Sequence, residues 1–412
     1  MAKRDLFEHI RKTSPQVVLL GGVILGAILV GASILLGIAS VTLTPAGGAR
    51  QVGYAAAPNW SIAFTLVFPL FVYFAMGAIR ATDRAFSSLA QMLVDHDGNP
   101  ATDAANTIER RYRRMLGKSS QIATVLACLA LAASLIEWVL CSVMPLLFGS
   151  PSPEQEVDWA VAKLGQGICV RMLNVVFTFV AYSTQGVYAA TLLVFLVYLV
   201  VFADVVRQLT DATTPPILVP DVQSTDPRRG FQHLGRVVEE VVFACGCVFL
   251  VFWLSRLQNL YLHSSTSTLW AFLTADLFET VLQFDAKAFF RAITDTGGLE
   301  YSSTVVMIGA VVVLSACVGV PLHTLRRAAV LGRDAARALT SRHPRLFARH
   351  CSDEAVDKGL NEMVVWPIAY PQLNELLFWI AFALLSICFY RLGVAFVMAW
   401  IWRVAKRAIG SK

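Results

Sequence analysis

The run VVLLGGVILGAILVGASILLGIAS, residues 17–40, indicates the fold class of this chain. It contains no charged residue, and it is longer than the ~20 residues that a helix needs to cross the ~30 Å hydrocarbon core of a bilayer. A basic head with Lys3, Arg4, Arg11 and Lys12 precedes it. The apolar region of a cleaved secretory signal spans only about 7–15 residues. The run therefore predicts a retained signal anchor that crosses a membrane.

Further runs along the chain are also long and apolar enough to span a bilayer as helices. They are residues 60–79, 122–148, 187–206, 238–254, 304–322 and 376–402. Hydrophobic residues make up 56% of the 412 residues and charged residues 15%, against about 25% in soluble domains. Open sheet edges cannot be satisfied in lipid, and the alternating pattern of a barrel strand is not seen. The sequence predicts an all-α, polytopic integral membrane helix bundle with six or seven transmembrane helices in one membrane domain.

The stretch 168–206 is too long for one crossing, because a single helix of that length would extend about 58 Å. The sequence Tyr-Ser-Thr-Gln-Gly at 182–186 offers a place to divide it. Counting both halves as spans would invert every later loop against the distribution of Lys and Arg. We therefore expect residues 168–182 to form a re-entrant or interfacial helix on the outer side, followed by a true span from Val187.

Loops rich in Lys and Arg alternate along the chain with loops that have few of them, as the positive-inside rule requires. This alternation places the N-terminus in the cytoplasm. The basic C-terminal tail breaks this alternation. It returns to the cytoplasm if Arg391 and Gly393 interrupt the last run, and lies outside if that run is one tilted helix. The expected location is a bacterial inner (plasma) membrane. The predicted loops are a cytoplasmic helical loop at 81–121, a cytoplasmic loop at 207–237, an outer-side amphipathic loop at 256–303 and a basic cytoplasmic helical loop at 323–373.

Glu137 is the charged residue that stands out within an apolar run. A carboxylate at hydrocarbon depth costs several kcal/mol unless it is paired, hydrated or protonated. Our hypothesis is an ion pair of Glu137 with Arg391 first and Arg171 second, lining a polar route through the bundle. The alternative is that Glu137, beside Trp138, reaches the outer interface and is hydrated there.

Small residues recur on one side of the first run, at Gly22, Gly26, Ser33 and Gly37. At 100° per residue they fall within about 60° of one another, which lets a second helix backbone approach closely. Packing within the chain is the simplest interpretation. A contact in a homo-oligomer and the lining of a pore are the alternatives.

Two stretches concentrate arginine beside predicted spans on the cytoplasmic side. Anionic lipid headgroups attract such stretches, and a cytosolic protein partner is the rival interpretation. The net charge of +6 is spread over several loops, so nucleic acid is not an expected partner. The candidate contact residues are Arg110, Arg111, Arg113, Arg114, Arg326, Arg327, Arg333 and Arg337.

Catalytic and cofactor motifs are missing from the sequence: it has no P-loop, dinucleotide fingerprint, metalloprotease helix or nucleophile elbow. His343, His350 and Cys351 lack a fourth ligand at zinc-finger spacing, so neither a metal nor a cofactor is predicted. An enzyme is not indicated. The predicted function is a channel or transporter that moves an ion or small solute past Glu137, Arg391 and Arg171. The alternative is a membrane-embedded scaffold, sensor or effector subunit that uses its basic loops.

Overall fold

The structure of this chain is a computed structural model that describes a large part of the sequence. The described residues are 7, 10, 12–43, 50–94, 101–144, 168–210, 217–218, 232–262, 319, 322–323, 326–327, 329–338, 358 and 360–363. The α-helices with complete bounds are α2 (Pro15–Leu35), α3 (Pro58–Ile62), α4 (Phe68–Gln91), α5 (Thr102–Trp138), α7 (Ile168–Thr210) and α8 (Gln232–Leu262). The strands are β1 (Val41–Leu43), β2 (Arg50–Val52), β3 (Leu93–Val94) and β4 (Ile217–Leu218).

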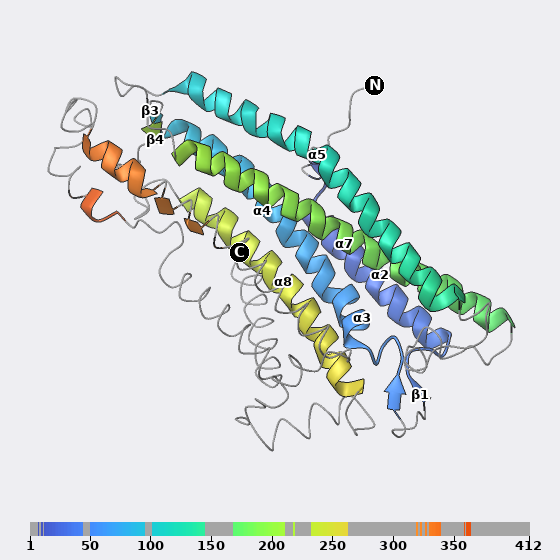
Figure 1. Ribbon diagram of the computed structural model, residues 1–412. Coiled ribbons are helices and arrows are strands. Elements are labelled where there is room, and N and C mark those ends of the chain that lie inside the picture. Colours follow the sequence, from blue (N-terminus) through green and yellow to red (C-terminus); the bar gives the residue numbers. More distant parts are fainter. Residues whose placement is uncertain are drawn as a thin grey trace, which may run out of the picture.

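Long apolar helices dominate this part of the chain and lie side by side in a bundle (Figure 1). Five of them are long and apolar enough to cross a membrane, which confirms a multi-pass, all-α architecture for the first five predicted spans. The two predicted runs at 304–322 and 376–402 fall almost wholly outside the described residues. The candidate spans are Pro15–Leu35, Asn59–Ser88, Glu109–Trp138, Met172–Val205 and Gly235–Ser255.

A proline at the start and a glycine turn at the end define the bounds of the first long helix, α2. Pro15 occupies the first turn, where a missing N–H costs nothing. At the other end Gly37 adopts a φ of 66°, and its N–H donates to the Ile34 carbonyl at 3.0 Å. The Ile38 N–H donates to the Ser33 carbonyl at 2.9 Å, which completes a Schellman motif. The chain then turns into the β1–β2 hairpin, with Leu43 opposite Arg50.

Aromatic contacts hold the bundle core together. The rings of Phe74 on α4 and Phe243 on α8 stack with centroids 5.0 Å apart. Phe71 on α4 meets Phe195 on α7 edge to face at 5.8 Å. A π-helical segment, Ala63–Val67, joins α3 to α4 within one continuous apolar span. Helix α4 therefore lies at the centre of the described bundle, with α7 and α8 against it.

The prediction that the chain divides at 182–186 is wrong, because Ile168–Thr210 is a single α-helix of 43 residues. Residues 168–182 are the first part of α7 and form no separate re-entrant or interfacial helix. The Thr184 hydroxyl donates to the Val180 carbonyl at 2.7 Å inside the helix. Gly186 lies against Ser134 of α5, where a Cβ would come 3.1 Å from the serine Cβ. Packing against α5 outweighs the ~1 kcal/mol that a helical glycine costs.

One end of the bundle is closed by short elements. Strands β3 and β4 pair in antiparallel register there, with Leu93 opposite Leu218. The described residues 329–338 are helical and bury Ala329 and Ala336 (Figure 1). Leu322 and Ala329 belong to the same buried cluster as the bundle core. Most described residues of the predicted loops 81–121 and 323–373 are helical, with residues 92–94, 101, 362 and 363 as exceptions, whereas residues 263–303 lie outside the described part.

Candidate functional site

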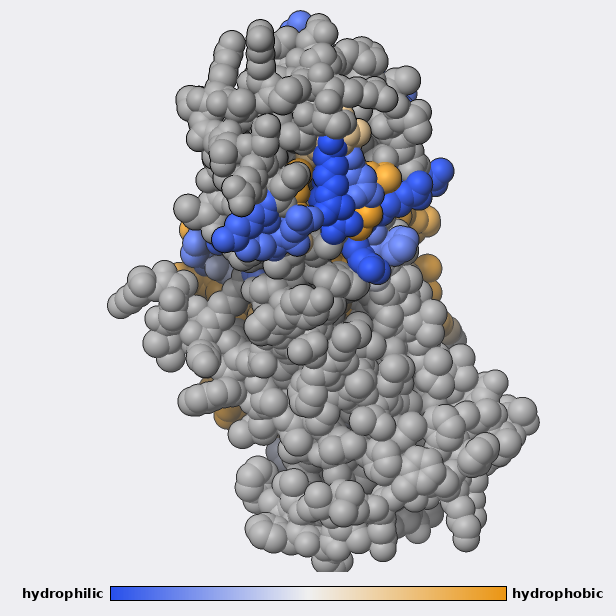
Figure 2. Space-filling model, turned by 90° about the vertical axis from the view of Figure 1, so that its left-hand side faces the viewer, coloured by the Kyte–Doolittle hydropathy of each residue, from blue (hydrophilic) through white to orange (hydrophobic). Residues whose placement is uncertain are grey.

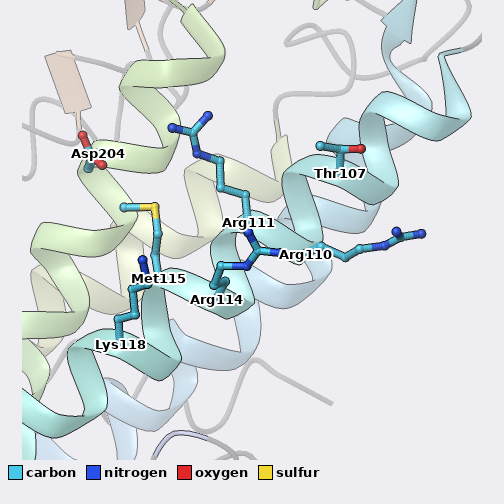
Figure 3. Close-up of a pocket in the computed structure, with 7 residues that line it drawn as sticks. All are labelled: Thr107, Arg110, Arg111, Arg114, Met115, Lys118 and Asp204. Atoms are coloured by element: carbon cyan, nitrogen blue, oxygen red, sulfur yellow. The ribbon is translucent and has the colours of Figure 1, made fainter.

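A basic cavity of about 770 Å³ lies along the first turns of α5 (Figure 3). Six of its lining residues come from α5 at a helical spacing of three, one, three, one and three, so they share one side of that helix. One further residue comes from α7. The lining residues are Thr107, Arg110, Arg111, Arg114, Met115, Lys118 and Asp204.

The charges of the basic cavity are strongly unbalanced. Its walls carry four cationic side chains and one carboxylate. Arg110 and Arg114 are four residues apart, as are Arg114 and Lys118, and like charges at this spacing repel by a few tenths of a kcal/mol per pair. All four cations are exposed, and within the described part of the chain none of them forms an ion pair. The cavity therefore offers positive charge and several N–H donors to an anion.

Arg113 stands on the same helix but outside the cavity. Its Nη2 atom lies 2.6 Å from the Oε1 atom of Glu109, one turn earlier, and forms an exposed ion pair. Of the four arginines predicted in this stretch, three line the cavity and one has its own carboxylate partner. Lys118 was not among the predicted contact residues, although its helical spacing from Arg111 and Arg114 was a sufficient signal. Asp204 was not among them either, because only the tertiary packing of α7 brings that residue to the cavity.

The second predicted arginine stretch is less uniform. The Nη2 atom of Arg337 donates to the Oδ1 atom of Asn361 at 2.6 Å, and the Nε atom of Arg333 lies 3.5 Å from the Oδ1 atom of Asp334. Arg326 and Arg327 are exposed. Figure 2 looks onto the end of the molecule that carries this segment, and the described side chains there are mostly hydrophilic. This end, with the four cavity cations, Arg326, Arg327 and Arg337, is called the basic end below.

Glu137 lies near the other end of α5 and is exposed. The Nε2 atom of Gln185 on α7 donates a hydrogen bond to its Oε2 atom at 3.1 Å. Arg171 precedes Gln185 by about 21 Å along the same helix, and its side chain is outside the described part. Arg391 also lies outside the described residues. The proposed ion pair of Glu137 with either arginine therefore stays a prediction.

The small residues of α2 face different surroundings. A Cβ at Gly22 would come 2.8 Å from the Cγ atom of Pro69, and a Cβ at Gly26 would overlap the Cα atom of Thr65. Ser33 is fully buried and donates to the Val30 carbonyl at 2.7 Å. Gly37 does not share this face, because α2 ends at Leu35 and Gly37 forms the turn that follows. Gly22 and Gly26 thus pack within the chain, and an oligomer contact through α2 stays a prediction.

A buried carboxylate that the sequence analysis did not select lies on α8. Glu240 is only 8% exposed, and a Cβ at Gly77 of α4 would come 2.9 Å from its Oε2 atom. The absence of a side chain at Gly77 therefore makes room for the carboxylate. Glu239 and Glu240 stand at the edge of a predicted span, where acidic residues are ordinary, so the sequence carried no signal that one of them is buried.

Comparisons with known proteins identify the family of this chain. Neither the curated proteins nor the solved structures contain a match to it. One family model, described as RcgA-like, matches residues 4–341. The match covers most of the chain, including the described spans and every residue of the basic cavity. This multi-pass membrane protein belongs to the RcgA-like family.

Proposed function

We propose that the protein is a membrane-embedded sensor or effector subunit whose basic end engages anionic lipid headgroups at the cytoplasmic face. The observation that carries this proposal is that the two arginine-rich segments, far apart in sequence, lie toward the same end of the bundle, the end that carries β3 and β4 (Figure 1). The positive-inside rule assigns that end to the cytoplasm.

Cations beside the apolar parts of α5, α7 and α8 support the same orientation. Lys118 precedes the apolar part of α5, Arg207 follows the apolar part of α7, and Arg236 precedes that of α8. All three side chains are exposed. Cations that flank apolar spans in this way are expected at headgroup depth, where each Lys or Arg contributes about 1 kcal/mol of attraction to an anionic leaflet. The attraction falls off within a Debye length of ~8–10 Å at ordinary salt.

Transport through a polar route is the rival proposal, and it depends on Glu137. That carboxylate is exposed and accepts a hydrogen bond from the Gln185 amide. It is also about 28 Å along α5 from Lys118, so the basic cavity does not reach it. Lipid engagement at the basic end is therefore the better supported of the two functions.

The test compares the thermal unfolding of the full chain in nanodiscs of phosphatidylcholine alone and with added phosphatidylglycerol. We expect the anionic lipid to raise Tm at low salt and to lose most of this effect at high salt, because exposed charges are screened. Replacing Arg326, Arg327 and the four cavity cations with glutamine should strongly reduce the effect. Equal Tm values in the two membranes at low salt would contradict the proposal.

A further inference from the structure

We propose that the basic cavity is a discrete, one-to-one binding site for a phosphate ester, with Arg111, Arg114 and Lys118 as its principal ligands. This inference rests on the proposed function and deepens it, because diffuse attraction to a charged leaflet needs no defined site. A phosphate ester here means a phosphomonoester or phosphodiester with an organic part.

The size and lining of the cavity select this ligand class. A volume of about 770 Å³ is far larger than a free phosphate needs and falls within the ~300–1,000 Å³ of ordinary ligand pockets. Met115 is half-buried and supplies an apolar wall for an organic part. The Thr107 hydroxyl, at the far end of the stripe, donates to the Asp103 carbonyl at 2.8 Å. The stripe from Thr107 to Lys118 extends about 16 Å along α5.

The charge of the cavity selects the phosphate. Guanidinium groups bind phosphate oxygens through two parallel N–H donors, which gives geometric specificity as well as charge. The cations repel one another along α5, so an anion between them relieves this repulsion when it binds. Asp204 stands across the cavity on α7, which favours a position of the phosphate against the α5 stripe (Figure 3). Arg113, paired with Glu109, is the natural comparison residue.

Two sources of the phosphate ester fit the position of the cavity. Lys118 lies about one helical turn before the apolar run that begins at Ile122, so the cavity opens at headgroup depth. A phosphodiester headgroup could enter from the leaflet, and a soluble phosphomonoester could enter from water. The two sources share the same recognition chemistry and are separated by experiment.

The experiment titrates the detergent-solubilised full chain with phosphatidylglycerol, phosphatidylcholine or glycerol 1-phosphate and counts bound molecules by native mass spectrometry. We expect one molecule of phosphatidylglycerol or of glycerol 1-phosphate to bind more tightly than phosphatidylcholine, whose phosphodiester carries a quaternary ammonium group that the cavity cations repel. The double variant Arg111→Gln/Arg114→Gln should weaken this binding about tenfold or more, because charge-assisted hydrogen bonds are lost. Arg113→Gln should bind like the wild type. Arg114→Lys, which keeps the charge but loses the paired donors, should weaken binding by a smaller factor.

The outcomes separate the sources and the proposals. If the double variant weakens the binding of phosphatidylglycerol and glycerol 1-phosphate does not bind, the natural ligand is a lipid headgroup. If the double variant weakens the binding of glycerol 1-phosphate, the natural ligand is a soluble phosphate ester. Binding that is absent, has no fixed stoichiometry, or falls equally with Arg113→Gln overturns the defined site. A salt-sensitive rise of Tm in phosphatidylglycerol nanodiscs would then still support the proposed function, whereas its absence would remove both.

Discussion

Tyr198 of α7 donates its phenolic hydroxyl to the carbonyl oxygen of Ala78 on α4, over 3.1 Å. The hydroxyl of Thr82 donates to the same carbonyl at 3.0 Å and also contacts the Tyr198 hydroxyl. Tyr198 and Thr82 are both fully buried. Because polar groups in an apolar bundle need internal partners, this group fixes the register of α4 against α7.

Tyr198→Phe should destabilise the bundle by about 1 kcal/mol, the scale of interhelical hydrogen bonds in membranes. The ring contacts with Phe195 and Phe202 would remain, so the loss belongs to the hydroxyl. The measurement is the unfolding free energy in mixed micelles. Tyr73→Phe, at a half-buried position on α4, is the control and should have little effect. A double-mutant cycle with Thr82→Val should give a non-additive result, and strict additivity would show that the two hydroxyls do not act together.

Gly26→Ala should be strongly destabilising, whereas Gly21→Ala on the same helix should be neutral or better. The added Cβ at Gly26 would meet the backbone of Thr65, which cannot rotate away, and overpacking of this kind costs about 1–3 kcal/mol. A Cβ at Gly21 meets nothing within 4 Å. Thermal unfolding of the two variants checks the pair. A loss of stability with Gly21→Ala would instead indicate that a second molecule covers the free side of α2.

The hydrophobic and basic patterns predicted much of this architecture, because length and hydropathy alone decide which segments can cross a bilayer. Five predicted spans correspond to candidate spans of the structure. The α5 part of the basic cavity was also within reach, since Arg110, Arg111 and Arg114 were selected and Lys118 follows at the next helical position.

Tertiary packing explains what the patterns did not predict. The stretch 182–186 has a composition typical of the end of a helix. Gly186 nevertheless fits closely against Ser134 of α5, and α7 continues through it. Gly37 has the spacing of a packing residue, but its positive φ ends α2. Asp204 reaches the cavity only because α7 runs beside α5. The Gly186 and Asp204 cases depend on contacts between segments, which periodicity within one segment does not contain, whereas Gly37 ends α2 through the local hydrogen bonds of the turn at residues 33–38.

The stability of the hairpin end should fall at alkaline pH through Tyr54. This residue is fully buried, outside the candidate spans, and its ring meets Phe177 edge to face at 5.3 Å. Burial, with a smaller effect from Tyr188, raises the pKa of the Tyr54 phenol well above its ordinary value of about 10. The folded state thus retains a proton that the unfolded chain releases. The contribution of the protonated Tyr54 phenol to the free energy of unfolding is therefore complete below about pH 10 and is lost as the pH rises further. Tyr54→Phe should show a smaller loss of Tm between neutral and alkaline pH than the wild type. Identical pH profiles would show that Tyr54 does not contribute.

The environment of Glu137 distinguishes a hydrated carboxylate from one that lines a route through the bundle. An exposed carboxylate on an apolar helix is stable where water or a charged partner reaches it, and the Gln185 amide donates a hydrogen bond to it. We therefore expect Glu137→Cys to react with a water-soluble maleimide added to one side of proteoliposomes. Ala133→Cys, one turn deeper on the same exposed side, should react far more slowly, because hydrocarbon excludes the reagent and holds the thiol protonated. Labelling is counted above that of the parent protein, whose Cys128 is also exposed on α5.

Equal protection of both cysteines from both sides would place Glu137 in a sealed contact, and the ion pair with Arg391 or Arg171 would then become the better explanation. Reaction of both from one side would reveal a water-filled path along α5, and would favour transport over lipid engagement.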